Sequence, residues 1–282
     1  DQAGVVRDEQ TFESGPGGNS VRKISRVSDY KDVLSVFGLN EKGIHADYQT
    51  IEFLTLTTGD FEDHIVVRDS LGQPDSQLNI NLGAGNDSVI VSDENETLDG
   101  IVGQVYIDAQ QGKNNSLIVS DSGDPDADSN VVIEHSSIKG LALGDIHYAA
   151  TQGGFESSYN PNTQSFESRI NFYGGSGGNN ISINSTRRDS SVIEITNVFA
   201  GSGDDIVSIH NPSSDSGEGQ PYLVVYGGLG SDRVDASSVL TSVTVYGDND
   251  ADYLHGGMSD DLLIGGSGND EVFGNGGDDT IL

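Results

Sequence analysis

The sequence predicts an all-β fold: a right-handed parallel β-solenoid with glycine-rich turns and a short helical cap at its N-terminal end. Three observations support this fold class. The C-terminal residues repeat a nine-residue pattern, and the apolar residues lie in short β-branched clusters such as "HIVV", "SVIV" and "LVVY", which are typical of strands. The 282-residue chain also combines 38 glycines with only 34% hydrophobic residues. That composition suits a narrow core that receives two or three residues from each strand.

The charge of the chain excludes several classes of function. Asp and Glu number 45 against 13 Lys and Arg, which gives a formal net charge of -32. Such a surface repels phosphate groups, so we expect no nucleic-acid partner. No apolar run approaches the length of a membrane span. Cysteine is absent, so disulfides cannot cross-link the fold and another kind of cross-link is needed.

Four consecutive nonapeptides fill residues 247–282. Each one begins with glycine, has Asp at the sixth position and has an apolar residue at the eighth. The sixth positions are Asp252, Asp261, Asp270 and Asp279, and the eighth positions are Leu254, Leu263, Val272 and Ile281. Such a fixed period indicates a stack of equivalent short structural units.

The same unit recurs at wider spacing in residues 51–246. Its sixth position holds Asp63, Asp87, Asp205 and Asp232 in recognisable copies, and Asn114 and Asn179 in weaker ones. Successive copies lie 20 to 27 residues apart, except for a gap of 65 residues between the two Asn positions. Asp145, in "GLALGDIHY", would divide this gap but is more typical of an ordinary turn.

Each unit is expected to form a tight glycine turn followed by a short strand whose apolar residue points inward. Two nonapeptides make one coil, and equivalent residues of successive coils stack about 4.8 Å apart. The chain then divides into an N-terminal segment at 1–50, an irregular solenoid at 51–246 with coils of 20 to 34 residues, and a regular β-roll at 247–282. The sixth-position residues, called slot residues below, are expected on one edge of the stack, with Asp261 and Asp279 alone on the opposite edge.

A column of stacked slot carboxylates needs positive charge. Two carboxylates about 5 Å apart repel by about 3 kcal/mol at an effective dielectric constant of about 20. A divalent cation reverses this effect, and calcium prefers roughly six to eight oxygens from carboxylates and backbone carbonyls. Glycines allow a turn to adopt positive φ and to direct several carbonyls toward one point. The pairing of glycine with aspartate therefore predicts several bound Ca²⁺ ions.

The nine-residue frame resembles the G-G-x-G-x-D-x-U-x repeat of the RTX (repeats-in-toxin) family. The resemblance is close at 247–282, good around Asp87, Asp205 and Asp232, and loose elsewhere in 51–246. It implies a calcium-loaded β-roll in which slot carboxylates and turn carbonyls hold each ion between two stacked turns. The implied ligands are Asp63, Asp87, Asp205, Asp232, Asp252, Asp261, Asp270 and Asp279, the turn residues Gly83, Gly85, Gly201, Gly203, Gly228, Gly230, Gly266 and Gly268, and Asn179 as a neutral ligand.

A second group of acidic residues lies in the loop "DSGDPDADSN" at 121–130. Asp124, Asp126 and Asp128 alternate as in the first half of an EF-hand loop. However, Ser129 and His135 stand where that motif needs Gly and Glu. A polar insertion is therefore the favoured interpretation, with a further calcium site as the alternative.

The two ends of the chain carry different signals. Apolar residues recur at i, i+3, i+4 and i+7 within residues 28–40, and Ser28 is the expected N-cap of a short amphipathic helix. This helix would cap the solenoid or, alternatively, dock an upstream domain. Past Ile281 the last strand leaves an open sheet edge, which predicts further repeats, a cap or end-to-end self-association.

Together these features predict a secreted calcium-binding β-roll module, a structural or adhesive segment of a larger extracellular protein that folds when calcium binds. Its expected partners are calcium ions and a cell-surface or matrix polysaccharide or protein. The resemblance to RTX proteins implies that the chain leaves a bacterial cell unfolded, by type I secretion. A chain without cysteine suits that route.

The alternative function is that of a polysaccharide lyase or epimerase, because parallel β-helices often carry such enzymes. The residues that such a site could use lie in the irregular middle of the chain: His147, Tyr148, Tyr159, Arg169, Tyr173, Arg187 and Arg188. Ser176 matches a G-x-S-x-G pattern but lacks the strand-then-helix context of a nucleophile. The calcium-binding interpretation assigns no catalytic residue.

Overall fold

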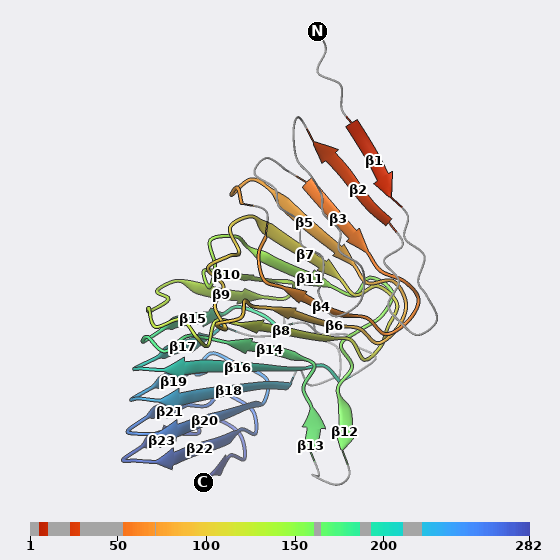
Figure 1. Ribbon diagram of the computed structural model, residues 1–282. Helices are drawn as coiled ribbons and strands as arrows, with labels where there is room; N and C mark the ends of the chain where they lie inside the picture. Colours follow the sequence, from red (N-terminus) through yellow and green to blue (C-terminus); the bar gives the residue numbers. More distant parts are fainter. Residues whose placement is uncertain are drawn as a thin grey trace.

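The computed structural model describes residues 6–10, 23–28, 53–70, 72–160, 165–186, 193–210 and 222–282 (Figure 1). Every regular element in these residues is a β-strand, which confirms the all-β prediction. None of the described residues forms a helix that is long and apolar enough to cross a membrane.

The strands form two large sheets and one small hairpin. Sheet A consists, in spatial order, of β1 (Val6–Gln10), β2 (Lys23–Ser28), β3 (Phe53–Thr57), β5 (Gln77–Asn81), β7 (Gln104–Asp108), β11 (Ile146–Ala149), β10 (Ser137–Lys139), β9 (Val131–Glu134), β15 (Asn180–Ile183), β17 (Ile206–Ile209), β19 (Arg233–Asp235), β21 (Tyr253–His255) and β23 (Glu271–Phe273). Sheet B consists of β4 (His64–Val67), β6 (Ser88–Val91), β8 (Ser116–Ser120), β14 (Ile170–Tyr173), β16 (Ile195–Ser202), β18 (Tyr222–Leu229), β20 (Val243–Asn249), β22 (Leu262–Ser267) and β24 (Thr280–Ile281). The hairpin is β12 (Ser158–Asn160) with β13 (Ser165–Glu167).

Strand pairing within the two sheets is largely parallel. In sheet A, β5 and β7 pair with Leu78 beside Val105, and in sheet B, β18 and β20 pair with Val225 beside Val245. The exceptions are the meander of β9, β10 and β11 and the outer strands β1 and β2, which pair antiparallel. From β3 onward the chain otherwise passes back and forth between the sheets. This arrangement is consistent with the expected parallel β-solenoid.

The core is a column of inward-facing residues between the two sheets. In sheet B the stacked inward residues are Val198, Val225, Val245 and Leu263, each no more than 1% exposed. In sheet A they are Val207, Val234 and Leu254, all fully buried. Because each coil supplies so few apolar residues, it depends on its neighbours to complete the core.

Aromatic residues stack on the outer face of sheet B. Tyr173, Phe199, Tyr226 and Tyr246 occupy equivalent positions of successive strands, with ring centroids 4.4, 4.5 and 4.7 Å apart and interplanar angles of 1°, 9° and 7°. These separations match the strand spacing of about 4.8 Å. The rings therefore follow the register of the strands, and their stacking stabilises it.

The N-terminal end of the solenoid differs from the prediction. Strands β1 and β2 extend sheet A beyond β3 by antiparallel pairing. Ser28, the expected helix N-cap, is the last residue of β2, because its neighbours pair with β1 and β3. The rest of the predicted helix, residues 29–40, lies outside the described residues.

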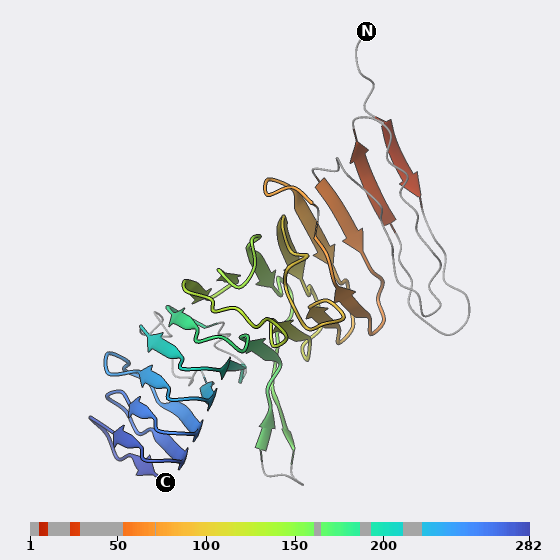
Figure 2. The same ribbon diagram turned by 60° about the vertical axis from the view of Figure 1, so that its left-hand side comes forward.

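The stack bends in its middle because the two sheets contain different numbers of strands. Three strands, β11, β10 and β9, lie between β7 and β15 in sheet A, whereas only β14 lies between β8 and β16 in sheet B. At about 4.8 Å per strand, the two extra strands lengthen one face by about 10 Å. Figure 1 shows the resulting inclination between the strands around β5 and those around β20, and Figure 2 shows the β12–β13 hairpin projecting from the stack near the bend.

Candidate metal centres at the corners of the solenoid

A corner is defined here as a tight turn together with the slot residue that ends it. The slot carboxylate accepts the backbone N–H of the slot residue one coil earlier in the sequence. The N–O distances are 2.9 Å from Asp63 to Asp87, 2.8 Å from Asp205 to Asp232, 2.8 Å from Asp232 to Asp252 and 3.1 Å from Asp252 to Asp270. Hydrogen bonds to an ionised acceptor are the stronger kind, so these contacts fix the Oδ1 atoms in a ladder across the coils.

The second carboxylate oxygen has a different environment. The Oδ2 atoms of Asp87, Asp205, Asp232 and Asp252 are buried and have no hydrogen-bond partner. Buried polar oxygens without a partner are rare in folded proteins, and each needs a physical explanation. A cation beside these oxygens would provide one.

Glycine keeps the space in front of Oδ2 of Asp232 and Asp252 open. A Cβ atom at Gly227 would collide with Oδ2 of Asp232 and would lie 2.8 Å from the carbonyl oxygen of Gly247 in the next coil. A Cβ atom at Gly247 would likewise collide with Oδ2 of Asp252. In these two turns the first glycine thus borders a small space that contains one carboxylate oxygen and one carbonyl oxygen. Oxygen donors of these two kinds are the ligands that calcium prefers.

The other predicted turn glycines also have the geometry that the sequence requires. All eight have positive φ, from 81° to 156°. At Gly228, where φ is 114°, a Cβ atom would collide with the carbonyl oxygen of Gly201 in the preceding coil. Glycine therefore allows the carbonyl oxygens of stacked turns to approach the neighbouring backbone closely.

Ionised slot carboxylates destabilise the fold when no cation is bound to them. Burial raises the pKa of Asp205 and Asp232 to about 7, and that of Asp87 and Asp252 to about 6, although the donated backbone N–H acts in the opposite direction. Acidic neighbours raise these pKa values further, as Asp204 does for Asp205. Near neutral pH each of these corners therefore favours either a proton or a cation on its carboxylate.

The slot residues lie on two edges of the stack rather than one. At the A-to-B edge the chain passes from sheet A to sheet B, and at the B-to-A edge it returns. The B-to-A edge carries Asn179, Asp205, Asp232, Asp252 and Asp270, each just before a strand of sheet A. The A-to-B edge carries Asp63, Asp87, Asp261 and Asp279, each just before a strand of sheet B.

The prediction that Asp63 and Asp87 share an edge with Asp205 is therefore wrong. The N-terminal coils have their long connections at the B-to-A edge, for example between β6 and β7. After β9 the meander and the hairpin place a long connection at the A-to-B edge instead. The tight turns consequently change edges, and the later coils are half a coil out of phase with the earlier ones. Asp145 precedes β11 and is not part of either ladder.

The slot of the third coil is Asn115 and not Asn114. The backbone N–H of Asp87 donates to Oδ1 of Asn115 at 2.8 Å, and Ser88 pairs with Ser116. The turn before Asn115 contains one extra residue, which displaced the frame. The apolar pattern offered a signal for this shift, because Leu117 then replaces Ser116 as the inward residue two positions beyond the slot.

In the two Asn corners the side-chain amide forms hydrogen bonds with both its oxygen and its nitrogen, so no cation is needed. Nδ2 of Asn115 donates to the carbonyl oxygens of Gly112 and Gly154, at 2.6 and 3.0 Å. Nδ2 of Asn179 donates to the carbonyl oxygen of Ala200, at 2.9 Å. Each Oδ1 atom already accepts a backbone N–H, which fixes the orientation of the amide. An amide N–H₂ therefore occupies the place of the unpartnered Oδ2 in the corners of Asp87, Asp205, Asp232 and Asp252.

The nine-residue frame did not predict that Glu194 occupies a slot. Glu194 directly precedes β16 at the A-to-B edge, is 3% exposed, and accepts the backbone N–H of Phe155 through Oε1 at 2.9 Å. The sequence around it contains no glycine turn, so the nine-residue frame could not reveal it. Among the described residues, no three Asp, Glu or His side chains form a cluster that could hold a metal. Cations at the corners must therefore rely on backbone carbonyls as well as carboxylates.

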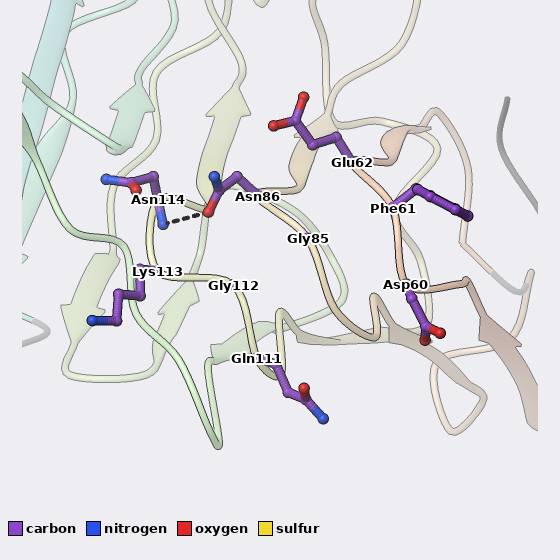
Figure 3. Close-up of a pocket in the computed structure, with 9 residues that line it drawn as sticks. All are labelled: Asp60, Phe61, Glu62, Gly85, Asn86, Gln111, Gly112, Lys113 and Asn114. Carbon is purple, nitrogen blue, oxygen red and sulfur yellow. Dashed lines mark hydrogen bonds between the residues drawn. The ribbon is translucent and has the colours of Figure 1, made fainter. Parts of the chain in front are cut away.

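The outer surface of the N-terminal corners is hollowed into a shallow depression of about 510 Å³. Its lining comes from three successive turns: Asp60, Phe61, Glu62, Gly85, Asn86, Gln111, Gly112, Lys113 and Asn114 (Figure 3). The backbone N–H of Asn114 donates to Oδ1 of Asn86 across two of these turns at 3.0 Å. The depression runs across the same turns that end in Asp63 and Asp87, so these corners are open to solvent on their outer side.

The residues considered for a polysaccharide-active site are dispersed where the structure describes them. His147 stacks on Tyr106 on the outer face of sheet A, with ring centroids 4.4 Å apart. Tyr148 is in the core at 1% exposure, and Tyr173 belongs to the aromatic stack on sheet B. Arg169 lines a second depression, near Asp87. The side chain of Tyr159, together with Arg187 and Arg188, lies outside the described residues.

Ser176 lies in a repeat turn. Its backbone N–H and its Oγ both donate to the carbonyl oxygen of Asp124, at 2.7 and 3.2 Å. The turn from Gly174 leads directly into β15, a strand of sheet A. These contacts join two stacked turns of the solenoid.

Comparison with known families identifies the C-terminal repeats. Residues 246–281 match the model of the RTX calcium-binding nonapeptide repeat, in four copies. This segment therefore consists of RTX repeats. The same slot ladder continues upstream of the match through Asp232 and Asp205. No curated protein and no solved structure matched the chain.

Proposed function

We propose that this chain is a calcium-binding β-roll module that folds as calcium binds at its Asp corners, and that it serves as a structural or adhesive segment of a secreted protein. The observation that carries this proposal is the set of buried, unpartnered Oδ2 atoms at Asp87, Asp205, Asp232 and Asp252. They belong to a chain with 45 acidic and only 13 basic residues, so basic side chains are too few to neutralise them.

The residues assigned to calcium occupy both edges of the stack. They are Asp205, Asp232, Asp252 and Asp270 at the B-to-A edge, and Asp63, Asp87, Asp261 and Asp279 at the A-to-B edge. Bound calcium would supply the positive charge that offsets the slot carboxylates and the carbonyl dipoles. The slot Oδ1 atoms hold the backbone of the preceding coil, and the turn glycines keep the adjacent space open.

Calcium binding is thereby coupled to folding. Each corner is built from two coils, so its ligands come together only when the coils stack, and the free energy of binding adds to the free energy of folding. In the low free calcium of a cell interior the chain would remain open, and in the millimolar calcium outside a cell it would close. RTX repeats, an acidic composition and the lack of cysteine support a secreted location and export in an unfolded state by type I secretion.

The test of this proposal is a calcium titration of the chain followed by circular dichroism. We expect the β-sheet signal to rise as calcium is added and to fall in excess chelator, whereas an equal concentration of magnesium should not restore it. A full β-sheet signal in chelator would contradict coupled folding. Calcium-dependent retention on a cell-surface or matrix polysaccharide would test the adhesive role, with the chelated chain as the control.

A further inference from the structure

The loop at 121–128 is a modified corner of the solenoid. Ser120 pairs with Tyr173, so the residue after it, Asp121, occupies the place of Gly174, the first residue of the next turn at this edge. The backbone N–H of Asp128 donates to Oδ1 of Asn179 at 2.9 Å, so Asp128 occupies a slot. From first residue to slot, the loop has eight residues and the turn that begins at Gly174 has six.

This corner has a carboxylate where the corners of Asp232 and Asp252 have glycine. At Gly227 and Gly247 a Cβ atom would collide with Oδ2 of the slot Asp of the same turn. Asp121 carries a whole side chain at the equivalent position, and the two extra residues of the loop widen the turn to receive it. The first position and the slot of this corner therefore both supply a carboxylate, and the two lie close enough for each to shift the pKa of the other.

Both carboxylates have an oxygen without a partner. Asp121 is 1% exposed; its Oδ1 accepts the backbone N–H of Leu98 at 2.7 Å, and its Oδ2 has no hydrogen-bond partner. Oδ2 of Asp128 is likewise buried and without a partner. Since Asp121 is almost wholly buried, its free oxygen cannot be satisfied by bulk water.

The charges around this pair are of one sign. Burial raises the pKa of Asp121 to about 7 and that of Asp128 to about 6, and negative charge on Asp124 raises both further. Asp99 adds to the effect on Asp121, and Asp126 to that on Asp128. Asp124 has local contacts of its own, because its Oδ1 accepts the backbone N–H of Asp126 at 2.9 Å.

We propose that Asp121 and Asp128 bind one divalent cation of the calcium type at this corner. The site lies far outside the nonapeptide repeats at 246–281. It differs from the EF-hand-like interpretation of the loop, because Asp121 takes part and the alternating Asp124 and Asp126 do not. Asp121 also accepts the backbone N–H of Leu98, in the N-terminal half of the chain, while the backbone N–H of Asp128 donates to Asn179, in the C-terminal half. The cation would therefore join the two halves of the stack at the bend.

The experiment is a count of bound calcium ions per folded chain by native mass spectrometry at saturating calcium. Asp128→Asn is expected to fold and to bind one ion fewer, because Asn179 shows that an amide fits a slot by donating to the oxygen that faces it. Asp121→Asn, and the double variant, are expected to lose the same single ion. Asp126→Asn, an exposed carboxylate of the same loop, is the matched control and should retain the full count.

An unchanged ion count in folded Asp128→Asn would overturn the proposal and would indicate that the two carboxylates share a proton instead. If Asp121→Asn does not fold, Asp128→Asn alone decides. Asp232→Asn keeps this test separate from the proposed function. Loss of an ion in Asp232→Asn but not in Asp128→Asn would support calcium binding at the Asp corners and would contradict only the site at Asp121 and Asp128.

Discussion

The N-terminal coils, residues 53–120, and the C-terminal coils, residues 193–282, use the same kind of corner on opposite edges. In the N-terminal coils the slots Asp63 and Asp87 lie on the A-to-B edge, and the opposite edge is occupied by longer connections. In the C-terminal coils the main ladder lies on the B-to-A edge, and near Asp261 the coil becomes short enough to have tight turns on both edges. The same corner geometry therefore forms on either edge of the stack.

Two corners near the junction of the two halves hold Asn in place of Asp and need no metal. Asn115 ends the N-terminal ladder and Asn179 lies at the start of the C-terminal one. Their side-chain amides donate to the backbone carbonyls that a cation would otherwise face. The middle of the molecule is therefore held partly by amide hydrogen bonds, whereas the outer coils have the Asp corners that we propose to bind ions. Calcium dependence should accordingly increase toward the C-terminal end.

The largest effect is expected from removal of calcium. Six of the assigned slot carboxylates lie in residues 193–282 and two lie in residues 53–120. Hydrogen exchange measured by mass spectrometry in chelator should show protection of the C-terminal coils falling at least about tenfold more than that of β5 and β7. Equal loss of protection in both halves would contradict a greater calcium dependence of the C-terminal coils. Magnesium in place of calcium is the control.

A central slot variant should be the next most damaging. Asp232→Ala removes a ligand and leaves the buried backbone N–H of Asp205 without its acceptor. We expect a loss of about 3 kcal/mol in the free energy of unfolding in calcium, measured by urea denaturation. Glu271→Ala, an exposed residue of β23, should change it by no more than about 0.5 kcal/mol. Similar values for both variants would argue against the role of the slot.

The glycine of a corner should affect calcium binding more directly than stability. Gly247→Ala places a Cβ atom against Oδ2 of Asp252 and the carbonyl oxygen of Gly265. We expect the calcium midpoint of folding to rise by about tenfold, equivalent to about 1.4 kcal/mol. Gly72→Ala, where a Cβ atom would meet nothing within 4 Å, is the matched control. An unchanged midpoint in Gly247→Ala would refute the assigned space.

Replacement of Asn179 by Asp should give this corner the calcium dependence that we expect of the Asp corners. Asn179→Asp replaces the donor to the carbonyl oxygen of Ala200 by an acceptor, so the chain in chelator should lose about 1 to 3 kcal/mol of stability. In calcium the same variant should bind one additional ion, counted by native mass spectrometry. Asn184→Asp, an exposed position after β15, should do neither. Wild-type behaviour of Asn179→Asp in chelator would contradict the amide corner.

The smallest effect is expected from pH. Because the folded-state pKa of Asp205 and Asp232 is raised to about 7, their contribution to the metal-free fold is complete below the unfolded value of 3.8 and is lost as pH rises through about 7. In chelator, lowering the pH from about 8 to about 5.5 should therefore strengthen the β-sheet signal of the C-terminal coils. In calcium the same change should weaken binding, because protons compete for the carboxylates. A metal-free signal that weakens on acidification would have the wrong sign.

Several features could be predicted from the sequence because they depend on local chemistry. The spacing of Gly, Asp and an apolar residue in "GGSGNDEVF" encodes a turn, a slot and an inward strand residue within nine positions. The glycines of positive φ were identifiable for the same reason, since glycine adopts that conformation without steric cost, although Asp248 and Asp250 also adopt it in one turn. Asn115 was misplaced by one residue because its frame depends on a hydrogen bond from Asp87, which lies one coil away.

The sequence by itself determined the repeat, the parallel strands and the pairing of aspartate with glycine, since these follow from steric and electrostatic preferences within one unit. Only the tertiary structure decided which edge each corner occupies and which carboxylates meet. The meander of β9, β10 and β11 shifts the phase of the coils, and the sequence carries no local mark of that shift. The meeting of Asp121 with Asp128 likewise depends on how two extra residues are accommodated against the neighbouring turns. Contacts between coils are set by the register of the whole stack, which no single repeat contains.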